Sequence, residues 1–253
     1  MLLLLACAAS DGDTGVVTGP EGAFELDTAQ PLDTSDTAPE DTGDTGVAPS
    51  NEQVCYPGAD GAWTTCLPLV DWQAGWGADY AYPDPMDGSA LYRAPIRFVD
   101  LSEGDPGVML AANFALSELM QEHKGRYGVF QPHAVERIQA LRERVGGPVT
   151  INSGYRNVTY NAGVGGATWS RHMYGDALDM RSSAASLDAL AGHCEALGAG
   201  YIGWYETHIH CDWRDDPLDE AFFGPAPPPW NDRIDGCENE DGPPRRSWRA
   251  TSD

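Results

Sequence analysis

The chain has 253 residues, of which 42% are apolar, with 29 glycines and 19 prolines. This suits a folded domain with irregular additions. Its formal net charge is −24, from 15 Lys and Arg against 39 Asp and Glu, which argues against a general nucleic-acid binder because phosphate backbones repel so acidic a chain. No apolar run approaches the roughly 20 residues that span a bilayer, so we do not expect an integral membrane protein.

The first seven residues end in Leu4-Leu5-Ala6-Cys7, which resembles the lipobox of bacterial lipoproteins, where the cysteine carries lipid and becomes the mature N-terminus. The stretch before Cys7 is shorter than a full export signal and holds no basic residue. We expect a lipoprotein-type signal remnant over 1–7, with membrane contact only through lipid on Cys7. The protein would then lie in the cell envelope, as an outer-membrane or periplasmic lipoprotein, or be secreted. The alternative is an ordinary disordered N-terminus.

Residues 8–54 form an acidic segment. Between Ser10 and Gln53 there are eleven acidic residues and no Lys or Arg. Such a stretch has little to bury, and its like charges repel and extend it, so we predict a disordered linker. A calcium-binding repeat is the alternative, but the spacing is irregular and lacks a fixed ligand pattern. The segment repeats the dipeptide Asp-Thr, at Asp13-Thr14, Asp27-Thr28, Asp33-Thr34, Asp36-Thr37, Asp41-Thr42 and Asp44-Thr45.

Five cysteines remain beyond Cys7. Cys55 and Cys66 bracket a short segment rich in turn residues, and we expect them to pair, since disulfides persist in exported chains. Cys194, Cys211 and Cys237 cannot all pair with one another, and the sequence leaves the choice open. The chain has no Cys-x-x-Cys, which argues against a cysteine-based zinc or thioredoxin-type site.

The elements predicted along the chain indicate an α+β fold with a small antiparallel sheet and flanking helices. Residues 55–109 read as irregular, with one strand over 91–101. A short helix is expected over 113–122, capped by Asn113, and the clearest helix over 132–145, with Pro132 at its start, one apolar face, and Gly146-Gly147 as its end. A strand over 149–152, a helix over 186–197 and a strand over 201–213 follow. The segment 224–253 reads as an irregular, Pro-rich tail.

Three histidines lie in two segments that suggest a metal site. His172 is followed seven residues later by Asp179, and the second segment is His208-Ile209-His210-Cys211-Asp212. In a strand, side chains alternate, so His208, His210 and Asp212 should share one face. A His-x-His alone is more often an ordinary histidine pair. Two imidazoles together with a carboxylate from another segment, however, have the composition of a catalytic zinc site with an open fourth position.

The region from Leu110 to Trp213 resembles the zinc D-Ala-D-Ala carboxypeptidases, of the superfamily that also contains lysostaphin and Sonic hedgehog. From this resemblance we predict a catalytic domain over residues 110–223. The segments Asn113–Glu118 and Val135–Arg142 are also similar to the N-terminal part of that family. The motifs that carry the resemblance are Ile151-Asn152-Ser153-Gly154-Tyr155-Arg156-Asn157, Tyr160-Asn161, Val164-Gly165-Gly166-Ala167, Ser170-Arg171-His172, Gly175, Ala177, Asp179 and His208-Ile209-His210.

The resemblance implies one Zn²⁺ held by His172, Asp179 and His210. Arg156 would lie on the substrate side, where a guanidinium can hold a carboxylate or a polarised carbonyl. His208 would face the metal-bound water or the developing oxyanion. Gly175 would allow a tight turn between the first two ligands.

One position departs from the pattern of the family. Many relatives carry a Glu or Asp general base three residues before the last zinc ligand, and here that residue is Thr207. Glu206, its neighbour, is one candidate for the base, and His208 is the other.

These observations predict a monomeric zinc peptidase that hydrolyses peptide bonds in the stems or cross-bridges of bacterial peptidoglycan. The alternative is a zinc-containing module that binds cell wall or protein and has lost its base. A structural zinc fits less well, because structural sites are usually closed by four protein ligands. Whether the enzyme is a carboxypeptidase or an endopeptidase, which bond it cleaves, and whether the wall is its own or foreign stay open.

Overall fold

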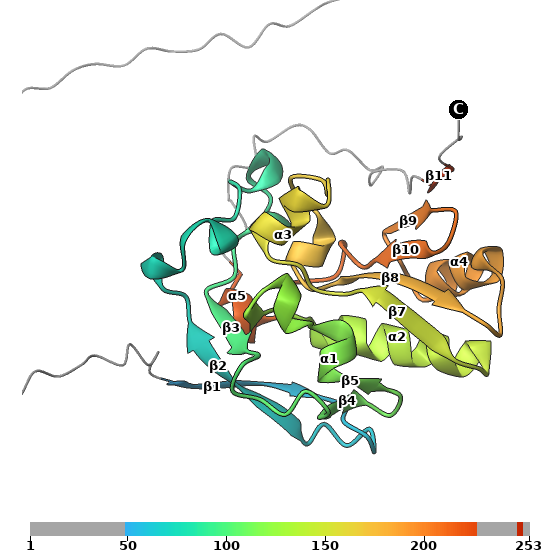
Figure 1. Cartoon of the computed structure of the whole chain (residues 1–253), viewed down its shortest axis with the longest axis horizontal. Coiled ribbons are helices and arrows are strands. Elements are labelled where there is room, and N and C mark those ends of the chain that lie inside the picture. The colour runs from blue at the N-terminus through green and yellow to red at the C-terminus, as the bar shows by residue number, and fades with distance from the viewer. Residues whose placement is uncertain (1–48, 227–246, 250–253) are drawn as a thin grey trace, which may run out of the picture. The chain divides into compact units, whose positions relative to one another are not determined.

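The computed structural model describes residues 49–226 and 247–249 (Figure 1). The predicted lipid anchor at Cys7, residues 8–48 of the predicted linker, and Cys237 lie outside the described residues. The linker predicted over 8–54 is wrong at its end, because residues 49–54 belong to a strand that pairs with its neighbour. The tail predicted as irregular over 224–253 likewise contains a short strand at 247–249. Within the described part, no helix is long and apolar enough to cross a membrane.

The main sheet has five strands in the order β11-β9-β10-β8-β7 (Figure 1). All neighbours pair antiparallel except β11 with β9, which are parallel. Helix α4 contacts β8, β9 and β10, and it also packs against α2. The fold is therefore α+β with a mainly antiparallel sheet, as predicted. The strands are β7 (Val149–Ser153), β8 (Ala177–Ser182), β9 (Tyr201–Trp204), β10 (Ile209–Asp212) and β11 (Ser247–Arg249).

Helix α2 spans Pro132–Val145, the bounds that the sequence predicts. Proline is favoured in the first helical turn, where its missing N–H is not needed. Val135, Ile138 and Leu141 are fully buried on one face. The helix ends at Gly146, which is left-handed at φ 63° and donates its N–H to two carbonyls of the last turn.

Helix α4 spans Leu187–Ala196 and is capped by Ser186, whose hydroxyl accepts a hydrogen bond from the Ala189 N–H at 3.2 Å. The remaining helices are short, and all are confined to loops around the sheets. They are α1 (Leu116–Leu119), α3 (Val158–Gly163), α5 (Glu220–Phe223) and the 3-10 turns η1 (Ala74–Tyr80), η2 (Met86–Gly88), η3 (Ala90–Tyr92), η4 (Glu122–Lys124) and η5 (Arg171–Met173).

A second, four-stranded antiparallel sheet precedes the region with the motifs, in the order β1-β2-β3-β6. Of its four strands, the sequence predicts only the one that contains β3. The predicted disulfide Cys55–Cys66 is present and joins β1 to β2. This sheet shares strand β6 with the region that carries the motifs, so the two parts are built together. Its strands are β1 (Pro49–Tyr56), β2 (Thr65–Asp71), β3 (Arg97–Asp100) and β6 (Tyr127–Gly128).

Two predicted elements that precede α2 differ from their predicted form. The strand expected over 91–101 begins only at Arg97 and is preceded by η3, because Pro95 has no N–H to give to a sheet. The helix expected over 113–122 is reduced to α1, since Phe114–Ala115 forms strand β5 and pairs with β4 (Met109–Ala111). Asn113 is therefore not a helix cap. Instead, the Glu118 carboxylate accepts a hydrogen bond from the Ala115 N–H at 2.9 Å.

Candidate metal centre

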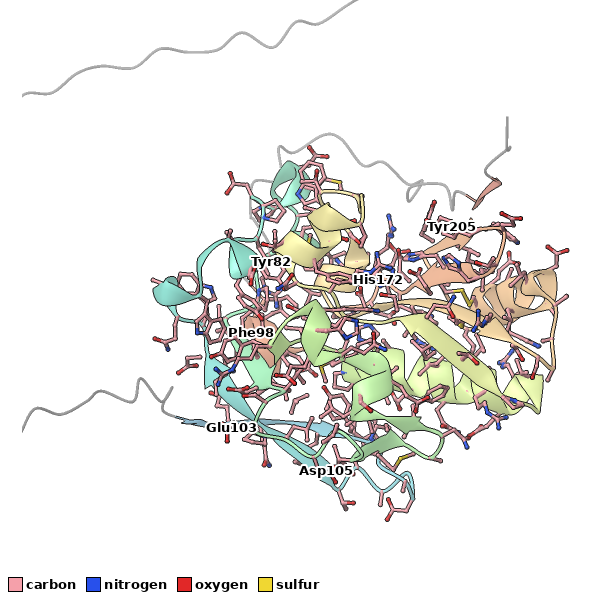
Figure 2. All side chains as sticks on the ribbon, viewed as in Figure 1. Tyr82, Phe98, Glu103, Asp105, His172 and Tyr205 are labelled. Atoms are coloured by element: carbon pink, nitrogen blue, oxygen red, sulfur yellow. A yellow bond between two sulfur atoms is a disulfide. The ribbon has the colours of Figure 1, made fainter. Side chains whose placement is uncertain are left out.

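His172, Asp179 and His210 converge although they come from three elements. Asp179 of β8 lies directly opposite His210 of β10 in the antiparallel pair. The turn η5 brings His172, which is labelled in Figure 2, into contact with both. Asp179 Oδ1 is 3.2 Å from His172 Nε2 and 2.9 Å from His210 Nδ1, and the two ring nitrogens are 3.1 Å apart. All three residues are buried.

These three atoms suit a zinc ion. Zinc bonds of about 2.0–2.2 Å in a tetrahedral arrangement separate neighbouring ligand atoms by roughly 3.3–3.6 Å. The observed separations are a few tenths of an ångström shorter, so small side-chain movements open the set to that size. Two imidazoles and one carboxylate are ligands that zinc accepts, and three protein ligands leave one position for water.

A backbone carbonyl orients His172. Its Nδ1 lies 2.7 Å from the Gly154 carbonyl, which can only accept, so Nδ1 carries the proton and Nε2 presents its lone pair to the site. Gly154 reaches this position because it has no side chain: a Cβ there would lie 2.1 Å from the Leu119 carbonyl oxygen.

The turn between His172 and Asp179 is held from inside. Arg171 is fully buried and forms an ion pair with Asp176, and its other terminal nitrogen donates to the Leu91 carbonyl at 2.5 Å. Gly175 adopts φ 75°, and a Cβ there would lie 2.3 Å from the Val129 carbonyl oxygen. The expectation of a tight glycine turn is thus confirmed, because no other residue fits this position without a shift.

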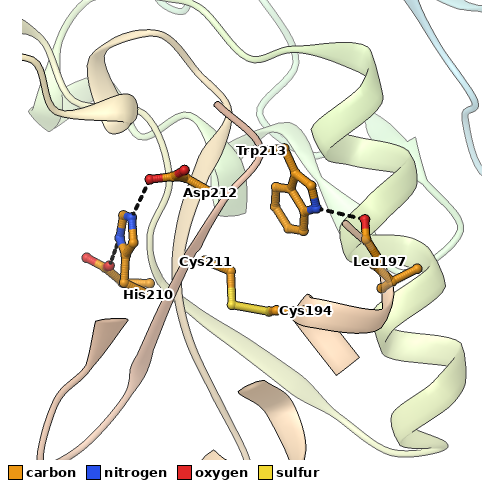
Figure 3. Close-up of a disulfide and its surroundings, with 7 residues drawn as sticks. Cys194, Leu197, His210, Cys211, Asp212 and Trp213 are labelled. Atoms are coloured by element: carbon orange, nitrogen blue, oxygen red, sulfur yellow. Dashed lines mark hydrogen bonds and ion pairs between the residues drawn. A yellow bond between two sulfur atoms is a disulfide. The ribbon is translucent and has the colours of Figure 1, made fainter. Parts of the chain in front are cut away.

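Asp212 orients His210 from the other side of its ring. His210 Nε2 is 3.1 Å from Asp212 Oδ2 (Figure 3), and this carboxylate is fully buried. Arg214 holds it with two hydrogen bonds, from Nε at 2.7 Å and from a terminal nitrogen at 2.5 Å. A carboxylate behind a ligating histidine fixes the ring and its tautomer.

The single strand predicted over 201–213 is a hairpin, β9 and β10, whose turn is residues 205–208. The predicted alternation holds within β10. His210 and Asp212 lie on the side of the metal centre, while Cys211 points to the other side and forms a disulfide with Cys194 of α4 (Figure 3). That disulfide answers the pairing left open by the sequence for these two cysteines.

The protonation of the three side chains is linked. Burial lowers the pKa of His172, against the effect of Asp179. Burial acts in the same direction on His210, but its hydrogen bonds with Asp179 and Asp212 outweigh burial and raise its pKa to about 9. The same histidines hold the pKa of Asp179 far below its usual value in spite of burial. Without metal, His210 is therefore an imidazolium that donates at both nitrogens, and a metal must displace the proton on Nδ1.

Arg156 lies beside the metal centre, as predicted from the motif. A terminal nitrogen forms an ion pair with Asp179 Oδ2, and Nε donates to Ser153 Oγ at 2.8 Å. No described residue accepts a hydrogen bond from its second terminal nitrogen, Nη1. The guanidinium thus steadies a ligand and keeps donors for another group.

The two candidates for the base lie in the hairpin turn. The His208 ring stacks on Tyr205, with ring centroids 4.5 Å apart, and its Nδ1 is 3.2 Å from Thr207 Oγ1. Glu206 is exposed. Neither His208 nor Glu206 has a hydrogen bond or ion pair with the three ligand side chains. Burial and the nearby Asp179 carboxylate raise the pKa of Tyr205.

The structure gives four residues around the centre contacts that the sequence does not predict. Asp212 was assigned to the face of His210 by strand alternation, but its contact with His210 and its partner Arg214 were not foreseen. Ser153 lies in the motif before Arg156, but its contact with Lys124 is not predicted, and Lys124 itself is not named as a site residue. The signal for Lys124 was available, since it is the only lysine in the chain.

Comparison with known proteins agrees with this geometry. Residues 112–212 match the family model of peptidase M15. This region of the chain, about two fifths of its length, is therefore similar to peptidase M15. Over 81 residues the chain is 44% identical to a zinc D-Ala-D-Ala carboxypeptidase of Streptomyces albus G. That similarity covers 29% of this chain and 31% of the relative, so less than a third of either protein is compared. The M15 region contains all three residues of the metal centre.

Proposed function

We propose that the protein is a zinc peptidase that hydrolyses peptide bonds in bacterial peptidoglycan, of the D-Ala-D-Ala type or in stems and cross-bridges. The observation that carries the proposal is the buried set of three converging ligand atoms on His172, Asp179 and His210 within an M15 region. The similarity to a zinc D-Ala-D-Ala carboxypeptidase supports both the metal and the class of substrate.

His172 Nε2, Asp179 Oδ1 and His210 Nδ1 would hold the zinc ion. A bound zinc lowers the pKa of its water and polarises a carbonyl. The chain itself supplies the rest. Gly154 and Asp212 keep both imidazoles turned toward the centre. Arg156 offers the N–H groups of Nη1 to a substrate oxygen, where a fixed donor is worth most if charge develops during the reaction.

The general base is assigned to the hairpin turn. Glu206 has a carboxylate of the kind that relatives use, while His208 is held by its stack on Tyr205 and precedes His210 by two residues. Histidine and carboxylate side chains both serve as general bases in enzymes. Glu206→Gln separates the two: a large loss of rate assigns the base to Glu206, and a small loss assigns it to His208.

The second candidate function is a zinc-containing module that binds cell wall or protein without cleaving it. Thr207, at the position of the usual base, favours it, as does the absence of any contact between Glu206 and the described metal-centre residues. We also propose a lipid anchor at Cys7, which lies outside the described residues, and a location in the cell envelope. A monomer fits both functions.

Digestion of purified peptidoglycan, with mass spectrometry of the released products, tests the proposal. We expect the zinc-loaded protein to release D-Ala or stem fragments, and a chelator to abolish the release. His210→Ala should lose both zinc and activity. Arg156→Ala should keep zinc but lose on the order of a hundredfold or more in rate. A protein that holds a full zinc and releases nothing from any peptidoglycan would instead be the binding module.

A further inference from the structure

Tyr205 is an aromatic residue that stays exposed although its ring is held in place. It directly follows β9 in the hairpin, where Figure 2 labels it, and 54% of its surface is accessible. Its ring stacks on the His208 ring with the two planes 6° apart, and its backbone N–H donates to the His208 carbonyl at 3.0 Å across the turn. Among the described residues, none forms a hydrogen bond with its hydroxyl. The turn therefore presents a fixed aromatic ring with a free donor to the solvent.

The Tyr205 ring lies on the same face of the sheet as the side chain of His210. Gly203 is the residue opposite His210 in the pair of β9 with β10, so side-chain positions on the two residues share one face. A Cβ built on Gly203 would lie 3.5 Å from His210 Cβ and 3.5 Å from Cε2 of the Tyr205 ring. Burial and the Asp179 carboxylate raise the pKa of Tyr205 above its ordinary value. The hydroxyl therefore keeps its proton at neutral pH and can donate a hydrogen bond.

One row of paired residues crosses the sheet at the candidate metal centre. At one end of the row, the Arg156 guanidinium contacts Ser153 and Asp179. At the other end, the Tyr205 ring lies beside Gly203. A substrate bound at the centre thus has Arg156 and Tyr205 on opposite sides. The row consists of Ser153 on β7, Asp179 on β8, His210 on β10 and Gly203 on β9, each paired with the next.

The length of this row determines how much of a peptide can contact it. Neighbouring strands are about 4.8 Å apart, so four strands span roughly 14 Å, the length of about four residues of an extended peptide. With the cleaved bond at the ligands on β8 and β10, Tyr205 lies about two residues away from that bond. A substrate of the D-Ala-D-Ala type has one residue after the cleaved bond. Only the part of the peptide before the bond is therefore long enough to reach Tyr205.

We propose that Tyr205 is a substrate-binding residue whose hydroxyl donates a hydrogen bond to a backbone carbonyl in the part of the peptide that precedes the cleaved bond. A neutral hydroxyl suits a neutral acceptor of this kind. Because the stack on His208 already fixes the ring, little conformational freedom is lost on binding. The inference rests on the proposed peptidase function and deepens it: the substrate is a peptide longer than a dipeptide, such as a stem.

Two peptides test this, an acetylated tetrapeptide ending in D-Ala-D-Ala and free D-Ala-D-Ala, which has no carbonyl before the one that is attacked. For the full-length, zinc-loaded protein, kcat/KM should favour the tetrapeptide by about 10-fold or more. Tyr205→Phe keeps the ring and its stack but removes the donor. It should lower kcat/KM for the tetrapeptide by about 3- to 10-fold, the range for a hydrogen bond between uncharged groups. The loss should lie in KM rather than kcat, since the contact is away from the reacting atoms, and the dipeptide should be unaffected.

Tyr127→Phe is the matched control. Tyr127 belongs to β6 of the four-stranded sheet, and its ring stacks on Trp76 with the centroids 3.6 Å apart. The change therefore also removes one hydroxyl from a stacked tyrosine, and it should leave the cleavage of both peptides unchanged. Zinc content and thermal stability are measured for each variant, which separates a lost substrate contact from a loss of metal or of structure.

Four outcomes would overturn this role of Tyr205: equal cleavage of both peptides by the wild type, equal kcat/KM of wild type and Tyr205→Phe on the tetrapeptide, an equal loss on both peptides, or a loss confined to kcat. If the wild type cleaves neither peptide, the proposed function fails first, and calorimetry with the tetrapeptide then decides on Tyr205. Binding that weakens in Tyr205→Phe but not in Tyr127→Phe supports the contact, and equal or no binding contradicts it.

Discussion

His210 has a hydrogen-bond partner at both nitrogens of its ring, and the partner on the side away from the candidate metal centre is the buried carboxylate of Asp212. Since Asp212 fixes the ring orientation and the tautomer, its loss should weaken metal binding even though it is not a ligand. We predict that Asp212→Asn lowers zinc affinity by about 10- to 100-fold, measured by competition with a chelator at neutral pH. Asp216→Asn is the control, because Asp216 pairs with Arg137 at 3.4 Å and does not contact the centre. Equal affinity in wild type and Asp212→Asn would refute this role.

For single residues of the candidate site, the sequence predicts those that lie in motifs. It does not predict those that reach the site only through tertiary contacts. His172, Asp179, His210 and Arg156 were foreseen and do lie together. Lys124 was missed because its partner Ser153 is 29 positions away and reaches it only when η4 packs against the end of β7. No periodicity or spacing encodes such a contact.

The hairpin of β9 and β10 is the element that carries His210, and a disulfide attaches it to helix α4. Cys211 lies between His210 and Asp212, so the bond to Cys194 fixes the strand on the side opposite the metal centre. The two cysteines are 17 positions apart, and closing a loop of that length contributes roughly 3 kcal/mol in the loop-entropy description.

We predict that replacing Cys194 and Cys211 together by alanine lowers the free energy of unfolding by about 2–4 kcal/mol and also weakens zinc binding. The control is the replacement of Cys55 and Cys66, whose bond joins β1 to β2 away from the centre. It should cost similar stability without changing zinc affinity. Urea denaturation and zinc titration of both double variants check this. Equal effects of the two pairs on zinc affinity would show that the hairpin needs no such anchor.

Prediction of elements succeeded where local signals agree. Helix α2 has its proline, its apolar face and its final glycine in sequence order, and its bounds follow from them. The segment around Asn113 carries a capping residue too, but pairing of β4 with β5 takes up its backbone. The turn that splits 201–213 into a hairpin lies at residues 205–208, which include no glycine or proline to mark it.

For the whole molecule, the part before the M15 match supports the metal centre. Residues 49–111 lie outside the matched region, yet the Tyr82 hydroxyl donates to the Met173 carbonyl at 2.7 Å, and the Leu91 carbonyl accepts from Arg171. Both contacts hold the η5 turn that presents His172. The irregular composition of this part does not reveal such a role, because its contacts are with residues some 80 to 90 positions later.

Protonation couples this centre to the stability of the whole fold. The pKa of His210 is about 9 in the folded chain and about 6.5 in the unfolded chain. Its contribution to the free energy of unfolding is therefore complete below pH 6.5 and is lost as the pH rises to 9. At most it amounts to about 3 kcal/mol. The pKa of buried His172 is lowered, so its effect has the opposite sign. Below pH 6.5 the unfolded chain takes up a proton on this ring more readily than the folded chain, and the free energy of unfolding falls. The carboxyl of Asp212, with a pKa of about 2, contributes above pH 4 and loses its contribution as the pH falls toward 2.

We therefore predict that the chelator-treated protein is most stable near pH 6.5 and loses stability on both sides. In the proposed site zinc would replace the Nδ1 proton of His210, so the stabilisation that zinc adds should increase as the pH rises from 6.5 to 9. Urea denaturation of chelator-treated and zinc-loaded protein between pH 5 and 9 measures both effects. In His210→Ala, the decline of the metal-free protein above pH 6.5 should flatten, and zinc should add little stability at any pH. A wild-type zinc increment that is independent of pH would show that His210 is not a ligand that must lose a proton.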